Sequence, residues 1–271
     1  MSANRFDVTG KVAVVTGGYG VLGGCLARGL AAAGARVAVL GRRRDPAQEK
    51  AEELRKSGAE SRALVADVRD RRQVEAVRDE LLRAWDRVDI LVNAAGGNVA
   101  AARSDDRPVF EVPPGAFDEV LASNLHGSVI PSLVFGEAMA ARRAGCIVNI
   151  SSMAALRVLS GVLGYSIAKA GVESLTRWLA VDLARRYGDG IRVNAIAPGF
   201  FVTDQNRSVL LHADGSPTER AQNILAHTPM GRFGRPEELV GSVLWLCSDA
   251  ASFVTGTVIP IDGGFSVASG V

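Results

Sequence analysis

The sequence has few cysteines and histidines and almost no excess charge. Its 271 residues include three cysteines and three histidines, and the formal net charge is +2. Cys25, Cys146 and Cys247 lie far apart, and no CxxC or Cys/His spacing occurs, so neither a disulfide framework nor a metal site is predicted. The small net charge gives no electrostatic argument for a nucleic-acid partner. We interpret the cysteines as reduced thiols of a cytoplasmic protein.

Long hydrophobic runs are also missing. No stretch approaches the roughly 20 apolar residues that a membrane span needs, and Met1–Lys11 has no apolar core of the kind found in signal peptides. Hydrophobic residues make up 48% and charged residues 22% of the chain, as in ordinary globular proteins. We therefore expect an intracellular protein with no membrane partner. Its length suits one large α/β domain or two small ones.

Short runs rich in Val and Ile alternate with segments of helical period. The runs are almost continuously hydrophobic, as strands covered on both faces should be. Such alternation predicts a parallel sheet with right-handed crossovers. We expect one domain over residues 1–271, a doubly wound α/β Rossmann fold with seven parallel strands and helices on both faces. The expected strands are Lys11–Thr16, Arg36–Leu40, Ser61–Ala66, Val88–Asn93, Cys146–Ser151, Ile191–Ile196 and Thr257–Ile261. The expected helices are Gly20–Ala33, Pro46–Ser57, Arg71–Trp85, Phe117–Arg142, Leu163–Tyr187 and Pro236–Ser248.

Residues 199–235 form the main segment without a regular pattern. They follow the sixth expected strand, and Gly and Pro stand near the two ends. Ligands of open α/β sheets bind beyond the carboxyl ends of the strands. A long segment placed there is predicted to be a substrate lid.

A glycine-rich turn follows the first expected strand. Gly18, Gly20 and Gly23 satisfy the pattern G-x-G-x-x-G, with a strand before it and a helix after it. Glycines let the backbone approach a pyrophosphate, and the free amides at a helix N-terminus hold its charge. The turn therefore predicts dinucleotide binding, and the alternative is a tight turn without a ligand.

The end of the second expected strand bears on the choice of cofactor. An NAD site usually offers an acid there to the ribose 2′-hydroxyl. Here the strand is followed by Arg42 and Arg43, and the first acid is Asp45. Arginine binds a 2′-phosphate through charge-assisted hydrogen bonds, whereas a carboxylate would repel it. The sequence thus favours NADP(H), and NAD(H) beside a solvated basic loop is the alternative.

Tyr165 and Lys169 stand four residues apart, with Ser152 thirteen residues before the tyrosine. Residues four apart on a helix lie on the same face, so the Lys169 ammonium can lie close to the Tyr165 phenol. A nearby cation is expected to lower the pKa of a phenol and make it useful in proton transfer near neutral pH. Ser152 could hold the oxygen that gains or loses the proton. Taken alone, the pair also suits a solvated helix surface.

These motifs together resemble the short-chain dehydrogenase/reductase family from about Gly10 to the C-terminus. One departure is visible, since Val21 stands where the family's usual Thr-Gly-x-x-x-Gly-x-Gly has its middle glycine. Gly20 is positioned to compensate for it. The matching elements are Thr16-Gly17 with Gly23, Asp67, Asn93-Ala94-Ala95-Gly96, Asn124, Ser152, Tyr165 with Lys169, Pro198-Gly199 with Thr203, and Asp262-Gly263-Gly264.

The resemblance implies a role for each position. Tyr165 would be the acid/base, Lys169 would lower its pKa and bind the nicotinamide ribose, and Ser152 would orient the substrate oxygen. Asn124 would hold a water that relays protons. For Asn93 and Asn124, the alternative is an asparagine that caps a loop. The implied cofactor contacts are Gly17, Tyr19, Val21, Leu22, Arg42, Arg43, Asp67, Val68, Asn93, Ala95, Gly96, Tyr165, Lys169, Pro198, Gly199, Val202 and Thr203. Among them, Asp67 and Val68 would contact the adenine, the segment Asn93–Gly96 the adenosine ribose, and the segment Pro198–Thr203 the nicotinamide carboxamide.

Six further segments resemble the D-mannonate oxidoreductase (fructuronate reductase) branch, namely Ala95–Asn98, Ala195–Phe201, Asp204–Arg207, Asp214–Arg220, His227–Gly234 and Asp262–Ser266. The branch implies a sugar-acid substrate, and the family as a whole implies a homotetramer. Asn98, Gln205, Asn206 and Arg207 are the predicted substrate contacts, and Arg157 or Arg232 could also bind a carboxylate. Two departures occur: Val99–Val112 is short for that branch, and Ala154 and Gly161 stand where Asn and Lys are expected.

Four alternatives remain open at this point. Two are enzymes acting on another sugar, a 5-ketogluconate reductase and a polyol dehydrogenase. The third is a 3-oxoacyl carrier-protein reductase. Such an enzyme would need a basic patch on which the carrier protein docks, and the sequence does not clearly show one. The fourth is a cofactor-sensing protein without catalysis, against which the complete Ser152, Tyr165 and Lys169 set argues.

Overall fold

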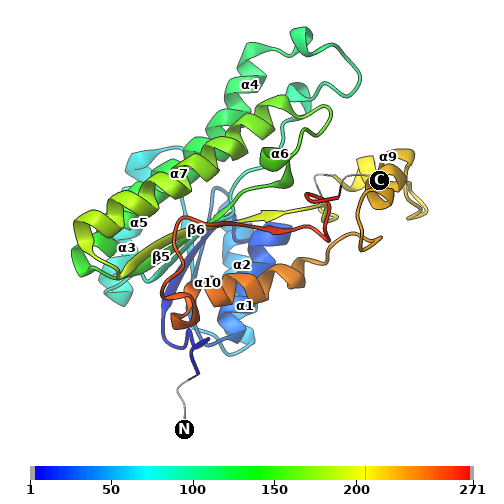
Figure 1. Ribbon diagram of the computed structural model, residues 1–271. Coiled ribbons are helices and arrows are strands. Elements are labelled where there is room, and N and C mark those ends of the chain that lie inside the picture. The colour runs from blue at the N-terminus through cyan, green and yellow to red at the C-terminus, as the bar shows by residue number, and fades with distance from the viewer. Residues whose placement is uncertain (1–3, 205, 269–271) are drawn as a thin grey trace.

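The computed structural model describes residues 4–204 and 206–268. Its seven strands form a single sheet in the order β3-β2-β1-β4-β5-β6-β7, and every neighbouring pair is parallel. This confirms the predicted doubly wound fold (Figure 1). The strands are β1 Val12–Thr16, β2 Arg36–Gly41, β3 Ser61–Val65, β4 Ile90–Asn93, β5 Gly145–Ile150, β6 Ile191–Pro198 and β7 Val258–Ile261.

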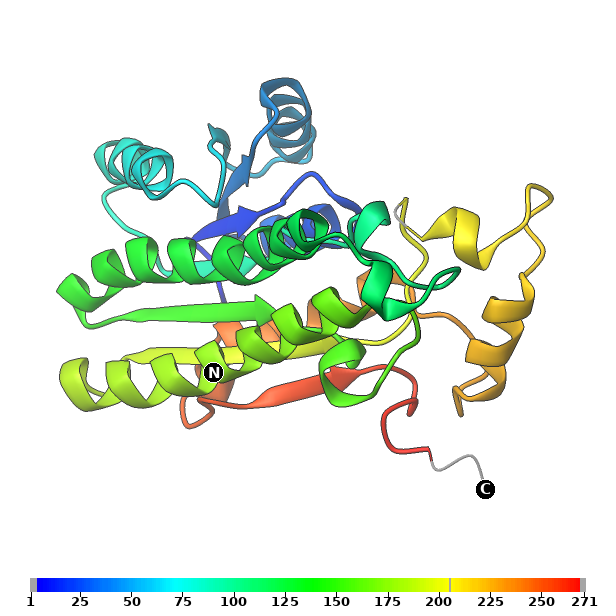
Figure 2. The same cartoon turned by 90° about the horizontal axis from the view of Figure 1, so that it is seen from above.

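Helices cover both faces of the sheet and bury two separate cores. One core packs α1, α2 and α10 against one face, and the other packs α3, α5 and α7 against the opposite face. Figure 2 shows α5 and α7 lying along the strands. Because both faces are covered, alternation of polar and apolar residues is absent from the central strands, as predicted. The longer helices are α1 Val21–Ala32, α2 Arg44–Lys56, α3 Arg71–Trp85, α4 Pro114–Leu121, α5 Gly127–Arg142, α7 Leu163–Tyr187, α9 Glu219–Ala226 and α10 Val240–Cys247. The short ones are α6 Met153–Leu156 and α8 Arg207–Leu210, and among the described residues no helix has the length and apolar character to cross a bilayer.

The order of the strands reverses between β1 and β4. Thr16 at the end of β1 stands in register with Asn93 at the end of β4. The glycine turn after β1 and the loop after β4 therefore leave the sheet side by side. A crevice at such a switch point is where doubly wound sheets bind nucleotides.

The predicted helix Phe117–Arg142 differs from the structure. The chain forms α4, then a π-helical turn over Ala122–His126, then α5. Asn124 lies inside this turn, and its side-chain nitrogen donates to the backbone carbonyl of Val120 at 2.9 Å. Side-chain bonds of this kind compete with the regular helical ladder, and π-turns often mark functional sites.

The segment 199–235 was expected to lack regular structure, and this expectation was wrong in part. It holds the short helices α8 and α9. Thr218 begins α9, and its hydroxyl accepts a hydrogen bond from the amide of Ala221 at 3.2 Å. The segment lies beyond the carboxyl ends of the strands, toward which the arrows of Figure 2 point.

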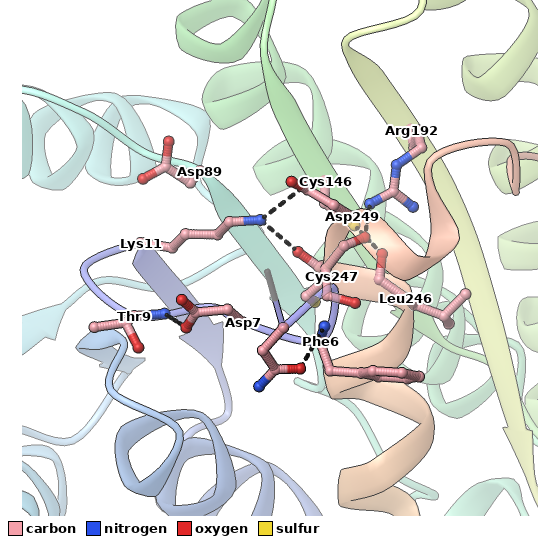
Figure 3. A network of polar contacts seen from close by, with 12 residues as sticks. Phe6, Asp7, Thr9, Lys11, Asp89, Cys146, Arg192, Leu246, Cys247 and Asp249 are labelled. Atoms are coloured by element: carbon pink, nitrogen blue, oxygen red, sulfur yellow. Dashed lines mark hydrogen bonds and ion pairs between the residues drawn. The ribbon is translucent and has the colours of Figure 1, made fainter. Parts of the chain in front are cut away.

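At the opposite ends of the strands, cationic side chains bind backbone carbonyls and so hold this side of the sheet in place (Figure 3). Lys11 donates to the carbonyl of Cys247 at 3.0 Å, at the end of α10, and Arg192 donates to the carbonyl of Ser248 at 3.2 Å. Positive charges at a helix C-terminus satisfy its free carbonyls and its dipole. The buried carboxylate of Asp89 accepts from the amide of Val12 at 2.9 Å and so fixes the start of β1.

Candidate active site

Tyr165 and Lys169 lie in the first turns of α7. The Lys169 ammonium stands 5.4 Å from the centroid of the Tyr165 ring and donates to the carbonyl of Ile150, at the end of β5, at 2.8 Å. Lys169 is only 4% exposed. A solvated surface pair would leave the lysine in water, so the buried arrangement favours the functional interpretation of the motif.

The pKa of Tyr165 differs in direction from the sequence-based expectation. Burial raises the pKa of the phenol, and a hydrogen bond with Ser152 opposes this rise. Burial also lowers the pKa of Lys169 to about 8. The cation was expected to lower the pKa of the phenol, but in this structure loss of solvent raises it. A phenol that holds its proton at neutral pH is suited to donate it.

Ser152 is the N-cap of α6. Its hydroxyl accepts from the amide of Ala154 at 3.2 Å, a bond typical of helix N-caps. The cap fixes the direction of this side chain at the end of β5, next to the phenol that its hydrogen bond stabilises in the ionised form. An oxygen bound between the two hydroxyls would receive one hydrogen bond from each.

Asn124 is fully buried and holds the loop that follows β4. Its side-chain nitrogen donates to the carbonyl of Gly97 at 2.7 Å, and its side-chain oxygen accepts from the amide of Gly97 at 2.9 Å. Its backbone carbonyl accepts from the Ser128 hydroxyl at 2.9 Å. A Cβ on Gly96 would stand 2.4 Å from the Asn124 oxygen, which explains the glycine at that position. The side chain thus holds the loop in place, as the loop-capping alternative expected. Its role in holding a water stays a prediction.

The turn after β1 has the shape of a pyrophosphate cradle. Gly17 has φ +61°, and a Cβ there would stand 2.9 Å from the carbonyl of Ala94, while a Cβ on Gly23 would stand 2.4 Å from the carbonyl of Gly17. The Thr16 hydroxyl accepts from the amides of Ala94 and Ala95 at 3.1 and 3.0 Å. Only glycines allow this close packing of the turn against the loop after β4.

Helix α1 begins at Val21, and its N-cap Gly20 offers no side chain to the first turn. The amides of Val21 and Leu22 therefore need another acceptor, and a phosphate suits them. Val21, which stands in place of the family's glycine, is the first residue of the helix. This cradle fits a dinucleotide.

An aromatic ring lies where β2 ends. Tyr19 covers Gly41 so closely that a Cβ on Gly41 would stand 2.1 Å from the ring. The Arg43 guanidinium lies 5.3 Å from the centroid of that ring. Arg42 and Arg43 are both exposed. A stacked, exposed arginine beside the turn is available to a phosphate.

Asp67 and Val68 follow β3, on the expected adenine side. The Asp67 carboxylate accepts a forked pair of bonds from Arg69, the shortest at 2.7 Å, and these bonds lower its pKa. Val68 is buried. With the Asp67 charge neutralised by Arg69, this end of the crevice is dominated by the arginines after β2.

The Asn93 side chain points into the protein rather than toward the crevice. It is 1% exposed and donates at 2.8 Å both to the Ser132 hydroxyl, on α5, and to the amide oxygen of Asn149, on β5. The Asn93 side chain therefore connects β4 and β5 to α5. Neither the predicted adenosine contact nor the loop-capping alternative anticipated this role. Ala95 and Gly96 form the loop wall instead.

The predicted nicotinamide contacts stand where β6 ends. Pro198 closes the strand, and the amide of Gly199 donates to the carbonyl of Ile261, on β7, at 2.9 Å. A Cβ on Gly199 would stand 2.7 Å from the Cα of Asp262, so a glycine is required. Val202 and Thr203 follow, both half-buried.

Two of the predicted substrate contacts that the structure describes, Asn98 and Asn206, bond to the backbone of their own loops. Asn206 is used by its own loop, since its side-chain oxygen accepts from the amide of Thr203 at 2.7 Å and its nitrogen donates to the carbonyl of Phe201 at 2.8 Å. Arg207 is exposed at the start of α8, and Gln205 lies outside the described residues. The Asn98 side-chain oxygen accepts from the amide of Val99 at 3.0 Å.

Sequence reasoning missed the ion pairs that fasten segment 199–235. Arg220 on α9 pairs with Asp105 at 2.7 Å and donates to the carbonyl of Ser160 at 3.2 Å. Its partners lie 115 and 60 positions away, so no local pattern signals them. A Cβ on Gly161 would stand 2.3 Å from the Asp105 carboxylate, which explains why glycine replaces the expected lysine.

Two arginines considered for a substrate carboxylate have partners within the protein. Arg232 forms a fork with Glu238 at 2.6 and 2.8 Å. Arg157 donates to the carbonyl of Ser266 at 2.7 Å. Both side chains therefore hold the rim of the site together.

Known proteins match nearly the whole chain. A family model described as enoyl-(acyl carrier protein) reductase matches residues 20–266. An uncharacterized oxidoreductase of Bacillus subtilis, UxuB, is 41% identical, with 98% of each chain covered. The crystal structure of a Haemophilus influenza protein named "putative D-mannonate oxidoreductase", with bound NAD, is 39% identical, covers 98% of each chain and has a TM-score of 0.92. A Beutenbergia cavernae structure named "putative NAD(P) dependent gluconate 5-dehydrogenase", with bound NADP at low occupancy, is 40% identical, covers 97% of this chain and 99% of its own, and has a TM-score of 0.86.

Proposed function

The chain belongs to the short-chain dehydrogenase/reductase family and is an NAD(P)-dependent oxidoreductase acting on alcohol or keto groups, and we propose that its substrate pair is D-fructuronate and D-mannonate, with NADP(H) as the preferred cofactor. The observation that carries the catalytic part of the proposal is the buried Lys169 beside Tyr165 and Ser152, at the carboxyl edge of the sheet. The relatives' names support the sugar-acid class.

The residues divide the proton chemistry among themselves. A bound nicotinamide supplies or accepts hydride at the reacting carbon, which is chemistry that the protein lacks. Tyr165 donates its proton to the carbonyl oxygen during reduction and takes it back during oxidation. Ser152 holds that oxygen by a second hydrogen bond. Lys169 carries a positive charge below about pH 8 and stabilises the phenolate that remains.

For fructuronate, reduction at carbon 5 gives mannonate. Among the predicted substrate contacts, Arg207 is the exposed cation that could meet the carboxylate, with Gln205 and Asn98 as hydroxyl partners. Asn206 acts through the loop that it holds. We assign residues 199–235 as the lid that brings these groups to the substrate.

The preference for NADP rests on the end of β2. Arg42 and Arg43 are exposed there, Gly41 stands where an acid is usual, and the carboxylate of Asp67, which follows the neighbouring strand β3, is paired with Arg69. A 2′-phosphate would find cations and no repelling charge. The two related structures were solved with NAD and with NADP respectively, so relatives of this chain use both.

The second candidate is reduction of 5-keto-D-gluconate, favoured by the 40% identity to the protein named gluconate 5-dehydrogenase. Initial rates of reduction of D-fructuronate and 5-keto-D-gluconate, each with NADPH and NADH, separate the proposals. Faster turnover of fructuronate with NADPH supports both parts of the first. Turnover with NADH alone contradicts the 2′-phosphate argument, and turnover of 5-ketogluconate alone replaces the substrate. Tyr165→Phe is the control for catalysis by this site.

We also assign a homotetramer, built through α5 and α7. Large apolar side chains are exposed on these helices, among them Leu133 (44%), Trp178 (70%) and Val181 (52%). Exposed apolar surface of this kind suits an interface between copies. Light scattering after size exclusion should give four times the mass of 28.4 kDa, and Trp178→Glu should lower it.

A further inference from the structure

Helix α7 buries two charged side chains one turn apart. Lys169 and Glu173 are each 4% exposed. Lys169 belongs to the catalytic set, whereas Glu173 has no part in the chemistry described above. A buried carboxylate is costly unless its hydrogen bonds are made, so its partners indicate what it does.

Glu173 connects α7 to the end of β5. One of its carboxylate oxygens accepts from the Ser151 hydroxyl at 3.0 Å, and the other accepts from the Arg177 guanidinium at 3.0 Å. The Ser151 side of this arrangement is interior, since Ser151 is 2% exposed and its amide donates to the carbonyl of Ile196, on β6, at 2.8 Å. The Arg177 side chain is 57% exposed.

Two successive turns of α7 thus bind two successive residues of the chain. Lys169 binds the carbonyl of Ile150, and Glu173 binds the hydroxyl of Ser151. The next residue is Ser152, whose hydroxyl interacts with the Tyr165 phenol and lowers its pKa. Tyr165 lies one turn before Lys169 on the same helix. The relative position of the two catalytic hydroxyls is therefore set by how firmly the end of β5 is held to α7.

We propose that Glu173 is a positioning residue, which acts through Ser151 to hold the Ser152 hydroxyl in place against Tyr165. The proposal rests on the reductase function assigned above, but not on the identity of the sugar. Displacing a reacting group by about 1 Å can cost about 10²-fold in rate. Losing the Glu173–Ser151 bond should accordingly slow the chemical step and leave cofactor binding unchanged.

The substitutions separate this role from a general effect on stability. Glu173→Ala and Ser151→Ala each remove the bond. Glu173→Gln keeps an oxygen for the Ser151 hydroxyl and removes the charge. Arg177→Ala removes only the exposed ion pair, so it should resemble Glu173→Ala only if the ion pair were what mattered.

The measurements are kcat for the reduction of D-fructuronate and of 2,3-butanedione, a small diketone that needs no sugar-acid recognition, and the dissociation constant of NADPH. The ratio of kcat with NADPH and with NADPH deuterated at the transferred position gives the primary isotope effect. A loss of folded enzyme lowers kcat without changing this ratio, whereas a slower chemical step raises it. Thermal unfolding shows which variants fold.

We expect kcat to fall about 10- to 100-fold in Glu173→Ala and in Ser151→Ala, with a larger isotope effect and an unchanged NADPH dissociation constant. The double variant should lose no more than either single one, because both remove the same bond. Glu173→Gln and Arg177→Ala should stay within about threefold of the wild type.

The proposal is overturned if Glu173→Ala keeps the wild-type kcat, if Glu173→Gln loses as much as Glu173→Ala, or if Arg177→Ala does. Additive losses in the double variant would also contradict it. A wild-type enzyme that reduces butanedione but not fructuronate refutes the proposed substrate alone, and the Glu173 comparison then proceeds on the diketone. A wild-type enzyme inactive on every carbonyl compound would refute both.

Discussion

The catalytic floor and the lid are held together by different forces. By the catalytic floor we mean the end of β5 and the start of α7, where Lys169 and Glu173 make buried hydrogen bonds to consecutive residues. The segment that we propose as the lid, residues 199–235, is fastened by ion pairs on the surface, such as Arg220 with Asp105 and Arg232 with Glu238. Their side chains are 24–48% exposed.

This difference assigns different tasks to the two regions. Buried hydrogen bonds leave the reacting groups little freedom, and breaking one leaves a polar group without a partner. Exposed ion pairs contribute about 0–1 kcal/mol and are screened by salt. The chemistry should therefore be insensitive to salt and very sensitive to substitution in the floor, whereas substrate choice should respond to modest changes in the lid.

The largest expected effect comes from breaking the floor at its centre. Tyr165→Phe removes the proton donor, so kcat should fall by about 10²- to 10⁴-fold. NADPH should bind as tightly as before, because the ring remains. Fluorescence titration of NADPH beside initial rates checks both statements. Normal turnover by this variant would remove Tyr165 from the reaction.

The second effect concerns the buried ammonium in the floor. Burial lowers the pKa of Lys169 to about 8 from an ordinary 10.5. The unfolded chain then binds more protons between these values, so the free energy of unfolding should rise with pH across that window. Relative to Lys169→Met, the gain should be about 3 kcal/mol.

Urea unfolding of both proteins between pH 7.5 and 10.5, at one protomer concentration, measures this gain. Titrating groups remote from Lys169 contribute equally to the two proteins and cancel in the difference. A difference that stays flat with pH would mean that Lys169 is solvated, and the floor would then resemble the lid.

The end of β2 offers a third case for the comparison. Its arginines are exposed like those of the lid, but we propose that they bind a cofactor rather than a carboxylate of the protein. Replacing Arg42 and Arg43 by Ala should raise the dissociation constant of NADPH by about 10- to 100-fold, because charge-assisted bonds to the 2′-phosphate are lost. NADH should be affected less than twofold. Equal losses for both cofactors would contradict the role in 2′-phosphate binding.

The smallest effect belongs to the lid itself. Arg220→Ala frees α9 from Asp105 and Ser160 and should raise the KM for the sugar acid about two- to fivefold, with kcat little changed. In the wild type, raising the salt concentration to 1 M should move KM in the same direction. Gln222→Ala serves as the matched control, because Gln222 lies on the same helix and its exposed side chain donates, within the described part of the lid, to the carbonyl of Pro217.

Much of the fold follows from local sequence. The strands are runs of Val and Ile, and their ends were predicted to within about two residues, because burial on both faces leaves an uninterrupted pattern. The pairing of Lys169 with Tyr165 also follows from local spacing. The π-turn at Ala122–His126 does not, since it depends on bonds between Asn124 and a loop 27 positions earlier.

The contacts of the lid and of Glu173 could not be predicted for a similar reason. Arg220 with Asp105 and Ser151 with Glu173 are pairs of ordinary residues that the fold brings together over 115 and 22 positions. The pKa of Tyr165 was misjudged because a spacing shows a nearby cation but not the loss of water. Local sequence patterns thus predict the helices and strands, whereas burial in the folded protein decides the pKa values of the side chains.

The most direct test of the division between floor and lid compares two substrates in two variants. Rates of reduction of D-fructuronate and of 2,3-butanedione are measured for the wild type, Glu173→Ala and Arg220→Ala. We predict that Glu173→Ala lowers kcat/KM for both compounds by the same factor, and that Arg220→Ala lowers it for fructuronate alone. An equal loss on both compounds in Arg220→Ala, or a loss confined to fructuronate in Glu173→Ala, would contradict this division.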